Sequence, residues 1–87
     1  MAAIAEETPI GRITHYYSHL NAGIVEFTGA DLNIGDVVHI KESHTDFRQP
    51  VESLQIENRD VTHADEGNSV GMKVKEKVRV HDPVFLV

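Results

Sequence analysis

Three short stretches of this 87-residue chain decide its fold: Gly35-Asp36-Val37-Val38, Gly67-Asn68-Ser69-Val70 and His81-Asp82-Pro83-Val84. Each has the composition of a tight turn that delivers the chain into an apolar strand. In the first stretch the glycine can adopt the left-handed backbone that such a turn needs, and the aspartate can hydrogen-bond its own backbone before the valines begin. The third stretch departs from the pattern, because histidine stands where the other two have glycine. Together the three turns predict a small β-barrel.

The composition allows one domain and favours strands. A chain of 87 residues buries only about 60% of the surface that its unfolded form exposes, so it cannot divide its core in two. Its apolar residues are rich in valine and isoleucine, which prefer strands. Cysteine is absent, which excludes disulfides and thiolate metal sites. We expect a flexible N-terminal lead-in at residues 1–9 and a single β-barrel domain at residues 10–87.

The charge and the N-terminal sequence restrict location and partners. The net charge of −6 argues against a protein that coats nucleic acid non-specifically, since that mode needs many lysines and arginines at phosphates. Glu6 and Glu7 stand where a secretory signal would have basic residues. No apolar run approaches the roughly 20 residues that span a bilayer. A cytoplasmic protein without membrane contact is expected.

Apolar and β-branched runs predict six strands, at residues 10–17, 22–27, 37–41, 51–56, 74–80 and 84–87. The segment 42–46 is polar and predicts a loop. The spacing of apolar residues breaks near Glu52-Ser53, which indicates a bulge. Residues 57–68 predict a bent strand followed by a turn. No segment predicts a helix of convincing length.

The segment around residues 72–80 alternates with a period of two. One predicted face carries four of the chain's eight basic residues: Lys73, Lys75, Lys77 and Arg79. The other carries Met72, Val74, Val78 and Val80. Cations about 6.6 Å apart on a strand match the phosphate repeat of an extended nucleic acid. The alternative is a solvated strand face that discourages edge pairing.

Aromatic and histidine residues give weaker signals. Tyr16 and Tyr17 would face opposite sides of one strand, so one of them can stack on a base or a partner. His15 and His19 would lie about 13 Å apart on a strand, too far to share a metal. The remaining histidines that have acids nearby show no recognisable ligand spacing; they are His39, His44-x-Asp46 and His63-x-Asp65. No metal site, cofactor or catalytic residue is predicted.

Four sequence patterns resemble domain 2 of translation elongation factors of the Tu type, over about residues 10–87. They are Gly11-Arg12-Ile13, Leu32-x-Ile34-Gly35-Asp36-x-Val38-x-Ile40, Val51-x-Ser53-Leu54-Gln55-Ile56 and Ala64-x-x-Gly67-x-x-Val70-Gly71-Met72. The resemblance implies a closed six-stranded antiparallel Greek-key barrel. The chain looks most like stand-alone translation elongation factor-like proteins of prokaryotes. Similar barrels also occur at the C-termini of collagenase-like peptidases linked to tRNA modification. No G-x-x-x-x-G-K-[ST] sequence is present, so GTP is not an expected ligand.

The resemblance implies a non-enzymatic RNA-binding module of protein biosynthesis. Its partner would be tRNA, another RNA or a ribosomal component, near the translation or tRNA-modification machinery. The expected contacts are Lys73, Lys75, Lys77, Arg79 and Tyr16. The alternative is a protein–protein interaction adaptor that docks on a larger enzyme without RNA contact, or a small homo-oligomer.

Overall fold

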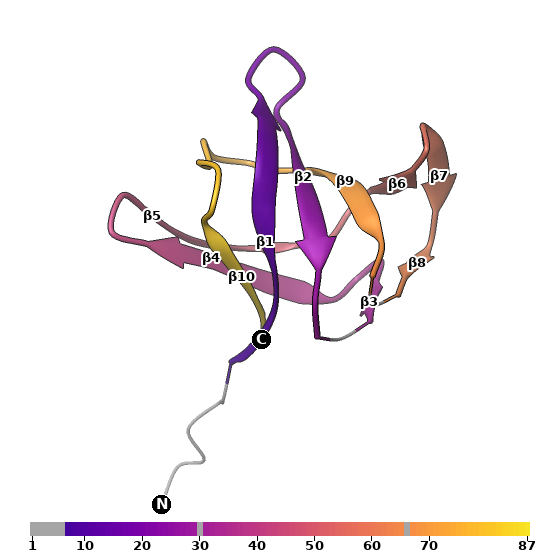
Figure 1. The fold of residues 1–87 in the computed structure, drawn as a ribbon, viewed down its shortest axis with the longest axis horizontal. Coiled ribbons are helices and arrows are strands. Elements are labelled where there is room, and N and C mark those ends of the chain that lie inside the picture. The colour runs from indigo at the N-terminus through magenta and orange to yellow at the C-terminus, as the bar shows by residue number, and fades with distance from the viewer. Residues whose placement is uncertain (1–6, 30, 66) are drawn as a thin grey trace, which may run out of the picture.

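The computed structural model describes residues 7–29, 31–65 and 67–87, and its regular structure is entirely β-strand (Figure 1). The strands are β1 (Thr8–Tyr17), β2 (Ala22–Phe27), β3 (Leu32–Asn33), β4 (Val37–Glu42), β5 (Thr45–Pro50), β6 (Leu54–Ile56), β7 (Arg59–Val61), β8 (His63–Ala64), β9 (Ser69–Lys73) and β10 (Pro83–Leu86). The all-β prediction is confirmed. Within the described ranges, no helix has the length and apolar character needed to cross a membrane. Residues 1–6 of the expected lead-in lie outside the described residues, and β1 already includes Thr8 and Pro9.

The strands form an eight-stranded antiparallel sheet with the order β5-β4-β10-β1-β2-β9-β6-β7, and β3 pairs with β8 in a second, two-stranded sheet. The expected closed six-stranded barrel is therefore wrong in strand number and in closure. Among the described residues, β5 and β7 are the two edges of the larger sheet. The count differs because β5, β7 and β9 were not foreseen as separate strands, while residues 74–80 form no strand. Strands β5 and β7 each fold back as the second arm of a tight hairpin (Figure 1).

Strand β5 begins inside the segment that the sequence predicts to be a loop. It alternates in burial, with Thr45, Phe47 and Gln49 inside and the residues between them exposed. Because Thr45 and Gln49 are polar, the inward-facing positions of this strand do not form an alternation of apolar residues. The sequence therefore does not indicate a strand here. The pairing of β5 with β4 is regular over its whole length.

The predicted strand at residues 74–80 is wrong, because β9 ends at Lys73. We call residues 74–82 the strap. The buried Gln49 side chain diverts the chain there: its Nε2 donates to the carbonyl of Lys73 (2.7 Å), and the N–H of Lys75 donates to its Oε1 (2.8 Å). Val74 and Val78 are buried without being in a strand. Their burial explains why the strap carries a strand-like pattern.

The three turns quoted from the sequence have one structure, which we call a corner. The corners are residues 33–36, 65–68 and 79–82. In the first, the N–H of Asp36 donates to the carbonyl of Asn33 (3.1 Å) and the N–H of Asn33 donates to Asp36 Oδ2 (2.9 Å). The second corner repeats these bonds at 3.1 and 3.0 Å, and the third at 3.1 and 2.9 Å. The residue before each side-chain acceptor has a positive φ: Gly35 (97°), Gly67 (90°) and His81 (80°).

Each corner also forms a reciprocal pair of backbone hydrogen bonds with a distant strand or strand end. The N–H of Gly35 donates to the carbonyl of Val51 (2.9 Å), and the N–H of Val51 donates to the carbonyl of Asp36 (2.7 Å). The equivalent two bonds measure 3.0 and 3.1 Å between the second corner and Phe27, and 2.7 and 2.8 Å between the third corner and Ile13. These three partners are buried, and so are the valines that follow the corners: Val38, Val70 and Val84. The corners therefore fix the apolar core.

Replacing His81 by glycine should stabilise the protein. Histidine at a φ of 80° is strained, whereas glycine adopts this conformation freely, so His81→Gly should raise the free energy of unfolding by about 1 kcal/mol. Urea denaturation would measure the change. Val80→Gly, at the neighbouring position, is the control and should not stabilise. A His81→Gly protein less stable than the wild type would contradict the prediction.

The Asp82 carboxylate should be needed only as a hydrogen-bond acceptor. Asp82 is 2% exposed, so Asp82→Ala removes a buried acceptor, leaves the N–H of Arg79 without its partner and should cost about 2 kcal/mol. Asp82→Asn should cost far less, because Asn68 makes the same bond in the second corner. Thermal and urea unfolding of both variants would check this. Equal losses in the two variants would count against it.

Candidate functional site

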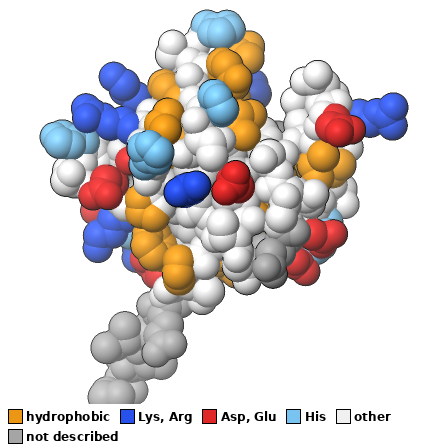
Figure 2. Space-filling view, viewed as in Figure 1, with side chains coloured by type: hydrophobic (Ala, Val, Ile, Leu, Met, Phe, Trp, Pro, Cys, Tyr) orange, Lys and Arg blue, Asp and Glu red, His pale blue; other side chains and the backbone are white. Residues whose placement is uncertain are grey.

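A groove of about 470 Å³ lies between the β1–β2 hairpin and the β6–β7 hairpin. Figure 2 shows the hollow between the hairpin at the top and the one at the right. The groove lies on the outer face of the sheet, since the positions of β2 that alternate with buried Gly23 and Val25 contribute to it. It is lined by Tyr17, Leu20, Ala22, Ile24, Ser53, Gln55, Asn58, Asp60, Gly71, Met72 and Lys73.

The wall formed by the β1–β2 hairpin is apolar and aromatic. Tyr17 is 41% exposed and Leu20 is 53% exposed. The Tyr17 ring lies parallel to that of His15, with centroids 6.3 Å apart, and His19 meets it edge-on at 6.4 Å. This flat aromatic surface is accessible to a partner.

The opposite wall is polar. It comes from β6, β7 and the turn between them, where Gln55 Nε2 donates to Asp60 Oδ1 (2.9 Å). The neighbouring Asn58 has a φ of 63°, in the left-handed region that the tight turn of a two-residue hairpin requires. A groove with one apolar wall and one polar wall can bind a ligand that carries both kinds of group.

Gly71 forms the floor of the groove, between Ile24 of β2 and Gln55 of β6. A Cβ atom added at Gly71 would lie 3.7 Å from Ile24 Cδ1 and 3.8 Å from Gln55 Cβ, which are ordinary contacts. The backbone there would thus tolerate a side chain. Glycine keeps the groove open, and a large residue would fill it.

Most of the basic residues that the sequence predicts to bind nucleic acid do not line this groove. Lys73 lines the groove, whereas Lys75, Lys77 and Arg79 lie exposed along the strap. They do not share one strand face, because the strap is not a strand. Tyr16 is partly buried and packs against the core. Its neighbour Tyr17 is the tyrosine that meets solvent.

Sequence reasoning missed the groove because its walls come from hairpins distant in the chain. One signal was available: Leu20 is an apolar residue within a predicted polar turn. Such an exposed residue beside an aromatic one is typical of a contact surface. The second wall depends on β7, a strand that the sequence did not predict as separate.

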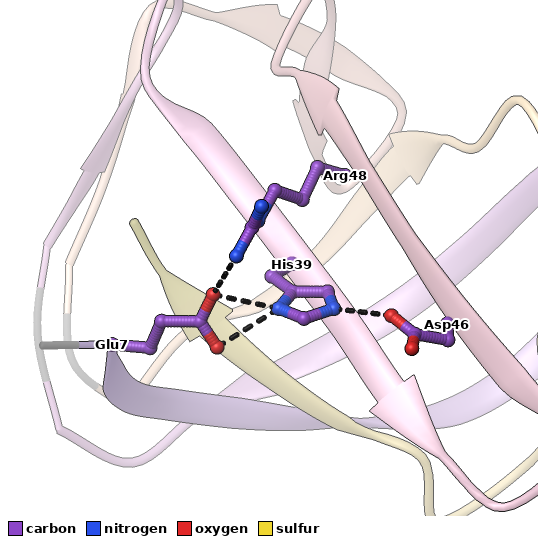
Figure 3. A network of polar contacts seen from close by, with 4 residues as sticks. All are labelled: Glu7, His39, Asp46 and Arg48. Atoms are coloured by element: carbon purple, nitrogen blue, oxygen red, sulfur yellow. Dashed lines mark hydrogen bonds and ion pairs between the residues drawn. The ribbon is translucent and has the colours of Figure 1, made fainter. Parts of the chain in front are cut away.

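A second polar arrangement surrounds His39 of β4 (Figure 3). His39 is 6% exposed. Its Nδ1 lies 2.7 and 2.8 Å from the Glu7 carboxylate oxygens, and its Nε2 lies 2.5 Å from Asp46 Oδ1. Arg48 Nη2 donates to Glu7 Oε2 (2.9 Å). The cluster links the residue before β1 to the β4–β5 hairpin.

This His39 cluster is built to hold chain segments together. Carboxylates contact both ring nitrogens of His39, which leaves neither nitrogen free as a general base. The hydrogen bond from Arg48, followed by that from His39, holds the pKa of Glu7 below its ordinary value of 4.5. The hydrogen bond from His39 likewise lowers the pKa of Asp46 from 3.8.

The two lowered carboxylate pKa values predict a loss of stability in acid. A carboxylate whose pKa is lower in the folded than in the unfolded chain stabilises the fold at pH values above its unfolded-state pKa. This contribution is lost as the pH falls through its folded-state pKa. Glu7→Gln should therefore destabilise the protein at neutral pH and reduce the fall in stability below about pH 5. Urea unfolding at several pH values would measure both effects.

Glu52→Gln changes an exposed carboxylate outside the His39 cluster and is the matched control for Glu7→Gln. It should keep the wild-type dependence of stability on pH. If Glu7→Gln also keeps that dependence, the contacts of Glu7 with His39 and Arg48 do not contribute to stability in the way that the lowered pKa of Glu7 indicates.

Comparison with curated proteins finds similarity to proteases. The chain is 35% identical over 79 residues to an uncharacterized protease of Methanocaldococcus jannaschii, covering 90% of this chain and 19% of that protein. It is 32% identical over 81 residues to a collagenase of Porphyromonas gingivalis, covering 92% of this chain and 22% of the relative. The chain thus spans about a fifth of the length of the curated relatives that it matches. No protein-family model matches the sequence.

Two solved structures share the fold. Both are crystal structures of the C-terminal domain of a Geobacillus thermoleovorans protein described as a U32 peptidase. One has a TM-score of 0.84 and 18% identity, with 100% of this chain and 99% of that chain covered. The other, a selenomethionine variant, has a TM-score of 0.81 and 19% identity, with 87% and 95% covered. The similarity therefore extends over essentially that whole domain.

These comparisons overturn the predicted relationship to elongation factors. The similar proteins are a protease, collagenases and a U32 peptidase domain, so a translation-factor-related, RNA-binding module of protein biosynthesis is wrong. The alternative, an adaptor that docks on a larger enzyme, gains no clear support either. The resemblance was misleading because its motifs contain corner residues such as Gly35, Asp36 and Gly67, which determine backbone geometry and do not specify one function. By sequence this chain is similar to part of a protease and of collagenases, and it shares the fold of the C-terminal domain of a U32 peptidase.

Proposed function

We propose that this chain is a polypeptide-binding domain of a U32-type peptidase and that it carries out no reaction of its own. The groove between the β1–β2 and β6–β7 hairpins is the observation that carries the proposal. The names of the curated relatives, a protease and a collagenase, support polypeptide as the ligand class. In this proposal the cleavage reaction belongs to another part of those longer proteins.

The two walls of the groove suit an extended peptide. Tyr17, Leu20 and Ile24 offer apolar surface to the peptide's side chains, and Ser53 and Asn58 offer polar groups to its backbone. Proline-rich segments bind aromatic-lined grooves well, because they are already extended and lose little conformational entropy. The name collagenase on two of the relatives agrees with such a proline-rich ligand.

Binding of a fluorescent proline-rich peptide from denatured collagen, followed by anisotropy, would test the proposal. Tyr17→Ala should weaken binding about tenfold, as loss of a central aromatic contact does. Gly71→Phe should abolish binding, because the new ring fills the groove. Lys77→Ala, on the strap, is the control and should bind like the wild type.

Circular dichroism and urea unfolding should show that Gly71→Phe remains folded, as the space around Gly71 indicates. No saturable binding by the wild type would refute the proposal for this ligand class. Equal binding by the wild type and by folded Gly71→Phe would show that the groove is not the binding site.

A further inference from the structure

Four side chains meet on one face of the small β3–β8 sheet, away from the residues that line the groove. Asn33 of β3 is paired with His63 of β8 in an antiparallel register. Asp31 and Asp65 each lie two residues from one member of this pair, and residues two apart on an extended chain project to the same side. The pairing therefore brings together an imidazole, two carboxylates and an amide.

The contacts orient the imidazole. His63 Nδ1 lies 2.7 Å from Asn33 Oδ1, and since the amide oxygen only accepts, the hydrogen is on Nδ1. The other ring nitrogen, Nε2, contacts Asp65 Oδ1 and lies 3.8 Å from Asp31 Oδ2. Possible ligand atoms of Asp31, His63 and Asp65 all lie within 4.8 Å of one another.

With the hydrogen on Nδ1, the lone pair of His63 Nε2 faces the carboxylates of Asp31 and Asp65, so a metal cation placed between them would contact all three groups. Histidines that bind metals commonly donate their other N–H to a fixed oxygen, as His63 does to Asn33. Asn33 thus holds the ring in the tautomer that a metal needs.

We propose that Asp31, His63 and Asp65 bind a zinc ion, with Asn33 as a positioning residue. One imidazole and two carboxylates are ligand types that zinc accepts, at about 2.1 Å from each ligand atom. Three protein ligands leave room for water in the coordination sphere. The three side chains are exposed, so the aspartates can move inward to the shorter ligand separations of a bound ion.

Isothermal titration of the chelator-treated chain with ZnCl₂ at neutral pH would test the site. The expected result is saturable binding of one ion per chain. His63→Ala and Asp65→Asn should each weaken the affinity at least about tenfold, the size of effect that even indirect changes at metal sites produce. Asp31→Asn should also weaken it.

His44→Ala is the matched control, because His44-x-Asp46 has the same spacing as His63-x-Asp65. It should leave zinc binding unchanged, as should Gly71→Phe, which separates this proposal from the function of the groove. Absence of saturable binding up to millimolar zinc would overturn the proposal. Wild-type affinity in His63→Ala, or an equal loss in His44→Ala, would overturn it as well.

Discussion

The reciprocal backbone hydrogen bonds between each corner and its distant partner are the constraint on which the rest of this structure depends. A small chain buries a limited core and must place its few large apolar residues accurately. The corners do this by bonding to Ile13, Phe27 and Val51, residues that are themselves buried. Each bond pair continues the pairing of two strands past its last register pair, as Asp36–Val51 follows Val37–Pro50, so the corners hold the curved sheet in shape.

Where the chain leaves the sheet, buried polar side chains supply the hydrogen bonds that strand pairing provides elsewhere. Gln49 replaces a missing neighbouring strand by accepting from one backbone amide of the strap and donating to one carbonyl. His39 connects two segments through paired carboxylates in a comparable way. Polar groups at these positions are satisfied, which is the condition for burying them without a large energetic cost. They also hold the strap and the residue before the first strand in place.

The sequence predicted the elements whose pattern is local. The strands near residues 10–17, 22–27, 37–41 and 84–87 and the three turns follow from apolar runs and turn residues. It could not predict β5, because the polar Gln49 faces inward there. It overpredicted a strand at residues 74–80, because Val74 and Val78 are buried on an irregular segment. The groove and the β3–β8 cluster depend on contacts between distant segments, which no local pattern specifies.

The second position of a corner has a property of practical use. The bonds that define the corner involve its first, third and fourth residues, and in the first and third corners the second side chain projects into solvent: Ile34 is 40% exposed and Val80 is 49% exposed. A side chain at these positions can thus be exchanged while the framework stays bonded. Cysteine introduced at position 34 or 80, in a chain that has no other, would provide a single attachment point for a fluorophore or a solid support.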